Sequence, residues 1–143
     1  MLTVIIDARA DATRLPALLA QLTAGAVDGL VRQVVIVAPR EGLVAELCEE
    51  TGADTALTLG DAAQAARSDL LLVAPPELRL RDGWIEQLTR FVADGGRVAR
   101  VTGLNGGLFN RPQGVLVERG RAVGHGDLAG LRRHLGLGLR RIG

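Results

Sequence analysis

The sequence has a single cysteine and neither lysine nor tyrosine. One cysteine among 143 residues cannot form a disulfide within the chain, which is typical of proteins in a reducing compartment. Cys48 follows Val44 and Leu47 at helical spacing. We therefore expect it to be a small core side chain rather than a nucleophile.

Signals of export, and the motifs of two common nucleotide-binding folds, are also absent from the sequence. Residues 2–6 already have the pattern of a strand, with no basic segment before them, and no long apolar segment follows. We expect no transmembrane helix and a cytoplasmic protein, either free or peripheral to the inner face of the membrane. No G-x-G-x-x-G motif follows the first strand and no P-loop is present, which disfavours dinucleotide-binding and Walker-type domains. We expect no nucleic-acid partner.

Charge is distributed unevenly along the chain, although the net charge is only +1. Residues 1–96 hold 8 arginines and 14 acidic residues, a net −6, whereas residues 97–143 hold 9 arginines and 2 acidic residues, a net +7. The basic part predicts a surface for phosphate, anionic lipid or an acidic partner. The alternative is a domain whose two parts neutralise each other when they pack.

Strand and helix patterns alternate along the chain, which predicts one α/β domain over residues 1–143. The expected architecture is a mainly parallel, doubly wound sheet with helices on both faces. Gly25 is expected to end the first helix, and Gly60-Asp61 to cap the third. The expected strands lie near residues 2–6, 34–38, 54–58 and 69–74, and the expected helices near residues 14–25, 43–50, 62–67 and 84–92.

Residues 97–143 depart from the regular alternation of strand and helix. Strands are expected at residues 97–102 and 113–118, and the glycine-rich residues 103–107 are expected to be flexible and outside the core. A helix follows with Leu128, Leu131 and Leu135 on one face, and Asp127 is a suitable N-cap for it. The tail from residue 137 is expected to fray.

The most informative segment is residues 68–84. Leu70 to Ala74 is a continuous apolar run, typical of a strand covered on both faces. Ligands of open α/β sheets bind beyond the carboxyl ends of such strands. Pro75-Pro76-Glu77 occupies that position, and Gly83-Trp84 opens the next helix.

This segment resembles the one that carries the Asp-X-Asp motif in family-2 glycosyltransferases of the GT-A type. In that family, too, an apolar strand leads into the motif. A short turn follows, and Gly-Trp often opens the next helix. Pro75 and Glu77 stand where the family has its two aspartates, and the loop at residues 38–42 lacks the usual acidic residue. The resemblance extends to residues 4–19 and to residues 114–133, which look like the segment leading to the catalytic Glu-Asp and the arginine-rich helix after it.

The resemblance implies a compact GT-A-like domain, with a nucleotide-binding half at residues 1–96 and an acceptor-side half at residues 97–143. It implies transfer of a sugar from a nucleotide-diphosphate donor to a hydroxyl acceptor in the synthesis of cell-envelope polysaccharide or glycolipid. Asp127 matches the catalytic base, and Asp11, Glu77, Arg132 and Arg133 are the expected donor-binding residues.

A divalent metal, Mn²⁺ or Mg²⁺, is a further implication of the resemblance. Glu77 matches one carboxylate ligand, and His125 is a second candidate ligand from the glycine-rich loop. Because Pro75 replaces the other carboxylate, we expect metal binding to be weak or absent.

Each candidate residue also has a purely structural interpretation. Glu77 would be a solvated turn residue, Asp127 a helix cap, Asp11 a surface charge before a helix, and His125 a solvated loop residue. Two other functions stay open: a GT-A-like module that binds a nucleotide, a sugar or a protein without catalysis, and an unrelated doubly wound domain with a structural role.

Overall fold

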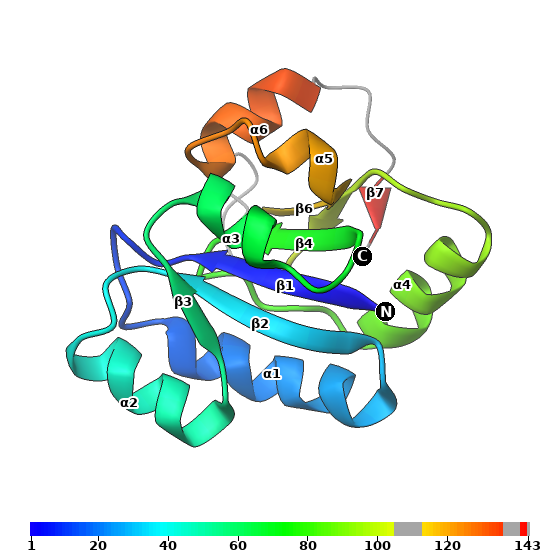
Figure 1. Ribbon diagram of the computed structural model, residues 1–143. Coiled ribbons are helices and arrows are strands. Elements are labelled where there is room, and N and C mark those ends of the chain that lie inside the picture. The colour runs from blue at the N-terminus through cyan, green and yellow to red at the C-terminus, as the bar shows by residue number, and fades with distance from the viewer. Residues whose placement is uncertain (105–112, 136–140, 143) are drawn as a thin grey trace.

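Seven strands pair into one mixed sheet in the computed structural model, which describes residues 1–104, 113–135 and 141–142 (Figure 1). The strand order is β3-β2-β1-β4-β6-β5-β7. The strands are β1 (Leu2–Asp7), β2 (Val31–Val37), β3 (Asp54–Ala56), β4 (Leu70–Ala74), β5 (Ala99–Thr102), β6 (Gln113–Glu118) and β7 (Arg141–Ile142).

Parallel pairing joins the first four strands, with β1 between β2 and β4. From β1 the chain moves outward through β2 to β3, and then crosses back to place β4 on the other side of β1. β6 runs antiparallel to both of its neighbours, β4 and β5, which makes the sheet mixed. The predicted α/β class and the parallel pairing of the four expected strands are confirmed.

Helices cover both faces of the sheet, as the alternating pattern predicts. Successive strand residues point to opposite faces, so Val4 and Ile6 belong to one hydrophobic cluster and Ile5 to the other. The first cluster includes residues of α1 (Leu15–Asp28), α2 (Gly42–Thr51) and α4 (Trp84–Ala93). The second includes residues of α3 (Leu59–Ala65), α5 (Arg119–Ala122) and α6 (Leu128–Leu135). Of these, α5 and α6 lie above the sheet in Figure 1. Cys48 is buried in the first cluster, as expected, and burial raises the pKa of its thiol.

The first helix does not end at Gly25, contrary to the sequence-based prediction. α1 continues to Asp28, and Gly29 ends it in the left-handed region with φ 90°. Gly25 is buried where α1 meets the aromatic ring of α4. A Cβ atom there would lie 2.6 Å from Trp84 Cη2 and 2.8 Å from Val31 Cγ2. The glycine therefore serves close packing between the two helices rather than helix termination.

The predicted cap of α3, Gly60-Asp61, lies two to three residues after the observed one. Thr58 is the N-cap, because its hydroxyl oxygen accepts a hydrogen bond from the Asp61 backbone N–H at 3.1 Å. Gly60 lies inside the first turn and faces the Val123 carbonyl, which a Cβ atom would approach to 2.7 Å. That close approach joins α3 to the segment after α5.

Two expectations for the last third are wrong where the structure describes the residues. Gly103 is buried, and a Cβ atom on it would lie 2.7 Å from Leu78 Cδ1, so this glycine packs in the interior. Arg141 and Ile142, which belong to the tail expected to fray, form β7 beside β5, and Ile142 is buried. Residues 105–107 of the glycine-rich segment and residues 137–140 of the tail lie outside the described residues.

Gly25→Ala should destabilise the protein by about 1–2 kcal/mol. Alanine improves helix propensity by up to about 1 kcal/mol, but overpacking against Trp84 and Val31 costs about 1–3 kcal/mol. Gly120→Ala in α5 is the matched control, because a Cβ atom there meets nothing within 4 Å. Urea unfolding should show that Gly120→Ala leaves the free energy of unfolding unchanged or raises it. Equal stability of the two variants would contradict the packing role of Gly25.

Candidate functional site

An open cleft of about 330 Å³ lies at the carboxyl ends of β1 and β4. From β1 the chain continues to β2 toward one edge of the sheet, and from β4 it continues to β5 toward the other edge. Such a reversal of strand order is the switch point where ligands of open α/β folds bind. The cleft is lined by the loop after β1, the turn after β4 and the start of α6. It brings together the predicted site residues Asp11, Glu77 and Asp127.

Arg9 holds one wall of this cleft in place. Its Nε and Nη2 donate to the two carboxylate oxygens of Asp7 at 2.9 and 2.8 Å, and Nη2 also donates to the Gly126 carbonyl at 2.8 Å. The hydrogen bonds that Arg9 donates to Asp7 raise the pKa of Arg9, and the charge of Asp127 adds to the effect. The arginine thus links the loop after β1 to the loop before α6. Sequence reasoning missed both Asp7 and Arg9.

Asp127 caps α6 and also lines the cleft. Its Oδ1 accepts a hydrogen bond from the Gly130 backbone N–H at 2.7 Å, the geometry of an N-cap. The side chain is exposed, and within the described residues its Oδ2 makes no hydrogen bond. The predicted cap is therefore confirmed, and one carboxylate oxygen stays available to a ligand.

Asp11 shapes the loop that precedes α1. Its Oδ1 accepts from the Thr13 backbone N–H at 2.9 Å and from the Thr13 hydroxyl at 2.6 Å. The hydroxyl hydrogen bond is the main cause of the lowered pKa of Asp11. The structural interpretation of Asp11, a charge that organises the turn before a helix, is supported by these contacts. The residue also lines the cleft.

Arg132 carries a largely buried guanidinium near Glu77. Burial lowers the pKa of Arg132, and the negative charge of Glu77 opposes that shift. Within the described residues, Nε and Nη2 of Arg132 are buried and have no hydrogen-bond partner. Buried N–H groups of a cation are costly when unsatisfied, so the arrangement favours an anionic ligand beside this side chain.

The structure places two other predicted residues, Arg133 and His125, apart from Arg132 and Glu77. Arg133 is exposed on α6, whereas its neighbour Arg132 turns inward. His125 is packed against His134 with ring centroids 4.7 Å apart, and it is not among the residues that line the cleft. The structure therefore gives His125 a ring partner that sequence reasoning missed.

The metal ligands that the resemblance implies are only partly present in the cleft. Pro75 lines it at the position of an expected carboxylate and offers no side-chain oxygen. Among the described residues, no group of three or more His, Cys, Asp or Glu is arranged to hold a metal ion. Glu77 is the one lining residue that matches the implied ligands.

Calorimetric titration of the protein with Mn²⁺, in the presence of a nucleoside diphosphate, should show no tight stoichiometric metal site. The physical reason is the loss of one carboxylate at Pro75, since hard divalent cations need several oxygen ligands. The control is the heat of Mn²⁺ binding to the nucleotide alone. A tight 1:1 site that disappears in Glu77→Gln would contradict this expectation.

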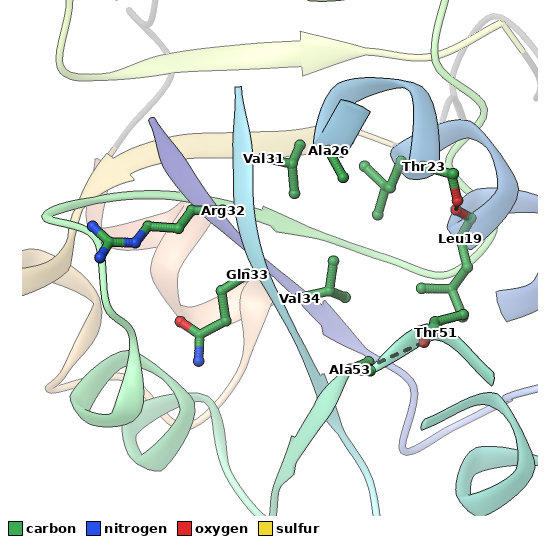
Figure 2. A pocket seen from close by; sticks show the side chains of 11 residues that line it. Leu19, Thr23, Ala26, Val31, Arg32, Gln33, Val34, Thr51 and Ala53 are labelled. Atoms are coloured by element: carbon green, nitrogen blue, oxygen red, sulfur yellow. Dashed lines mark hydrogen bonds between the residues drawn. The ribbon is translucent and has the colours of Figure 1, made fainter. Parts of the chain in front are cut away.

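A second hollow, of about 150 Å³, lies between α1, β2 and the end of α2 (Figure 2). Its two threonine hydroxyls already have partners. The Thr23 hydroxyl donates to the Leu19 carbonyl at 3.0 Å, and the Thr51 hydroxyl donates to the Leu47 carbonyl at 2.6 Å. The cleft at β1 and β4 is the better candidate site, because four carboxylate side chains line it and the charge of one of them, Glu77, acts on the buried Arg132.

Comparisons of the chain with known protein families and with curated proteins find no match. In the part of the chain that the structure describes, every helix is too short or too polar to cross a membrane.

Proposed function

We propose that the cleft at the ends of β1 and β4 binds a nucleotide-diphosphate sugar, and that the protein is a compact glycosyltransferase of the GT-A type. One observation carries the proposal. Asp11, Glu77 and Asp127 are far apart in the sequence, yet they line one cleft at the switch point of the sheet. Their resemblance to family-2 glycosyltransferase segments assigns all three to the donor and acceptor site.

The arrangement of the sheet supports the same proposal. Residues 1–96 contribute the parallel strands β1 to β4, as expected of a nucleotide-binding half. β6 follows as an antiparallel strand, and α6 returns the chain to the cleft with Asp127 and Leu128. An acceptor-side half that closes a donor cleft in this way is consistent with a GT-A architecture.

The chemistry needs neutralisation of a leaving group and removal of one proton. The acceptor hydroxyl oxygen attacks the anomeric carbon of the donor, and the bond from that carbon to the diphosphate oxygen breaks. The nucleoside diphosphate leaves with the bonding electrons, and Asp127 takes the hydroxyl proton. Arg132, two of whose guanidinium nitrogens are buried and lack partners among the described residues, binds the anionic diphosphate in this proposal. The negative charge of Glu77 favours the charged form of Arg132.

A second candidate is a GT-A-like module that binds the same donor, or another partner, without catalysis. Two observations favour it. Pro75 stands where a carboxylate is expected, and Asp127 already uses one carboxylate oxygen to cap α6. The two candidates share the binding site and differ only in turnover.

The proposal is tested by a thermal-shift screen of nucleotide-diphosphate sugars, with and without Mn²⁺ or Mg²⁺. A donor at 100 times its dissociation constant adds about 2.7 kcal/mol to the free energy of unfolding. We expect at least one donor to raise Tm, and free sugars not to. No shift with any nucleotide-diphosphate sugar would contradict the proposal.

A further inference from the structure

Arginines gather at the opposite end of the sheet from the cleft. Two hollows, of about 290 and 340 Å³, lie where β1 and β4 begin and where β6 ends. Asp69 and Arg97 line both hollows, so we treat the two as one basic site. The other arginines of the basic site are Arg32 and Arg67 in the first hollow and Arg119 in the second.

Four arginines and two acidic residues line the basic site, so half of its arginine charge is left unneutralised. Asp69 is paired with Arg119, whose Nη2 lies 3.4 Å from Asp69 Oδ1. The guanidinium groups of Arg32, Arg67 and Arg97 make no hydrogen bond or ion pair within the described residues. Glu118 is the other acidic residue that lines the site. Apart from the pair of Asp69 and Arg119, the basic site therefore has three arginines and one carboxylate.

Ser68 supplies an independent indication of a missing ligand. The residue is only 7% exposed, and it lines the first hollow. Within the described residues its buried Oγ has no hydrogen-bond partner. Buried hydroxyl groups are normally satisfied, because an unsatisfied one is costly. A polar ligand in the hollow would satisfy it.

The backbone around Ser68 is held in place by a buried glutamine. Gln33 Oε1 accepts a hydrogen bond from the Arg67 backbone N–H at 2.9 Å and another from the Thr3 hydroxyl at 3.1 Å. Gln33 Nε2 in turn donates to Asp54 at 2.9 Å. Figure 2 shows the neighbouring Arg32 side chain extending away from Val31 and Val34. The segment that presents Arg67 and Ser68 is therefore fixed without any ligand.

We propose that this basic site binds a phosphate group, with Arg32, Arg67 and Arg97 as the cationic contacts and Ser68 as a hydroxyl contact. Guanidinium groups bind phosphate oxygens through charge-assisted hydrogen bonds. The site lies at the amino ends of the parallel strands, so it is separate from the donor cleft and does not depend on the proposed function. The phosphate belongs either to a free compound or to the head group of an anionic lipid.

The experiment titrates the ¹⁵N-labelled full chain with sodium pyrophosphate and follows backbone amide shifts. We expect saturable shifts at Ser68, Asp69 and Arg97, whatever happens at the donor cleft. A parallel arm measures co-sedimentation with phosphatidylcholine vesicles, with and without phosphatidate. The variants are Arg67→Gln and Ser68→Ala, and Arg90→Gln is the matched control because Arg90 is an exposed arginine on α4 that lines neither hollow.

Arg67→Gln should weaken binding by roughly 10- to 100-fold, whereas Arg90→Gln should leave it unchanged. Ser68→Ala should weaken binding without lowering Tm. Binding of pyrophosphate assigns a free phosphate compound, and binding of phosphatidate vesicles alone assigns a lipid head group. The proposal is overturned if neither probe binds, if shifts occur only around Arg9 and Leu128, or if Arg67→Gln and Arg90→Gln weaken binding equally.

Discussion

Trp84→Ala should lower the free energy of unfolding by about 3–5 kcal/mol, the range for removal of a buried aromatic side chain. Domains of this size have about 5–15 kcal/mol in total, so the variant should be only marginally folded. The indole is 8% exposed and belongs to the cluster between the sheet and helices α1, α2 and α4. Its Cη2 lies against Gly25 of α1, so the ring joins α4 to α1. Denaturant unfolding measures the loss.

A double-mutant cycle with Gly25→Ala tests the same contact. Removal of the ring leaves room for a methyl group at Gly25, so Gly25→Ala should cost much less in the Trp84→Ala background than in the parent. Trp84→Phe, which keeps an aromatic ring, should retain more stability than Trp84→Ala. Strictly additive effects of the two substitutions would contradict the contact between Trp84 and Gly25.

Asp127→Asn should abolish most sugar transfer while donor binding changes little. General-base catalysis contributes about 10²–10⁴-fold to the rate, and asparagine cannot accept the acceptor proton in the same way. Asparagine caps helices about as well as aspartate, so the free energy of unfolding should hardly change. The measurement is donor turnover with the acceptor, beside calorimetric donor binding and urea unfolding.

Asp127→Ala distinguishes the role of Asp127 as a helix cap from its role as the catalytic base. Alanine also loses the hydrogen bond from the Gly130 N–H, which should cost about 1 kcal/mol of stability. Both variants should lose turnover, and only Asp127→Ala should lose stability. Parental activity in Asp127→Asn would remove Asp127 as the base. A parent that binds a donor but transfers no sugar would favour the non-catalytic module.

The strands and most helices were predictable because their patterns are local. The apolar run at residues 70–74 and the β-branched segment at residues 2–6 have the strand period and composition wherever they lie in the sheet. Gly25 could not be interpreted in the same way. A glycine late in a helical pattern usually ends the helix, and here the contact with Trp84, distant in the sequence, decides its role. The strand β7 was missed because two residues carry too little periodicity.

The candidate site was predictable where it follows from the topology of α/β sheets. Residues after β1 and after β4 meet at one edge, which places Asp11 and Glu77 together. The hydrogen bond from Arg9 to the Gly126 carbonyl was not predictable, because it depends on how the loop before α6 returns to β1. The burial of Arg132 was missed for a similar reason. Its position beside the apolar face of α6 could have suggested a half-buried side chain, but not its proximity to Glu77.

Calorimetric titration with the nucleotide-diphosphate sugar that gives the largest thermal shift tests the central claim most directly. The protein is compared with Glu77→Gln in the cleft and with Arg132→Gln, whose guanidinium is proposed to bind the diphosphate. Arg90→Gln and Glu50→Gln are the controls, because they make the matched charge changes on exposed helix positions. We predict 1:1 binding to the parent and both controls, weakened about tenfold or more by Arg132→Gln, since hydrogen bonds to charged groups contribute about 1.5–3 kcal/mol. Glu77→Gln should weaken it less. Equal affinity in Arg132→Gln, Glu77→Gln and the two controls would contradict a donor site in this cleft.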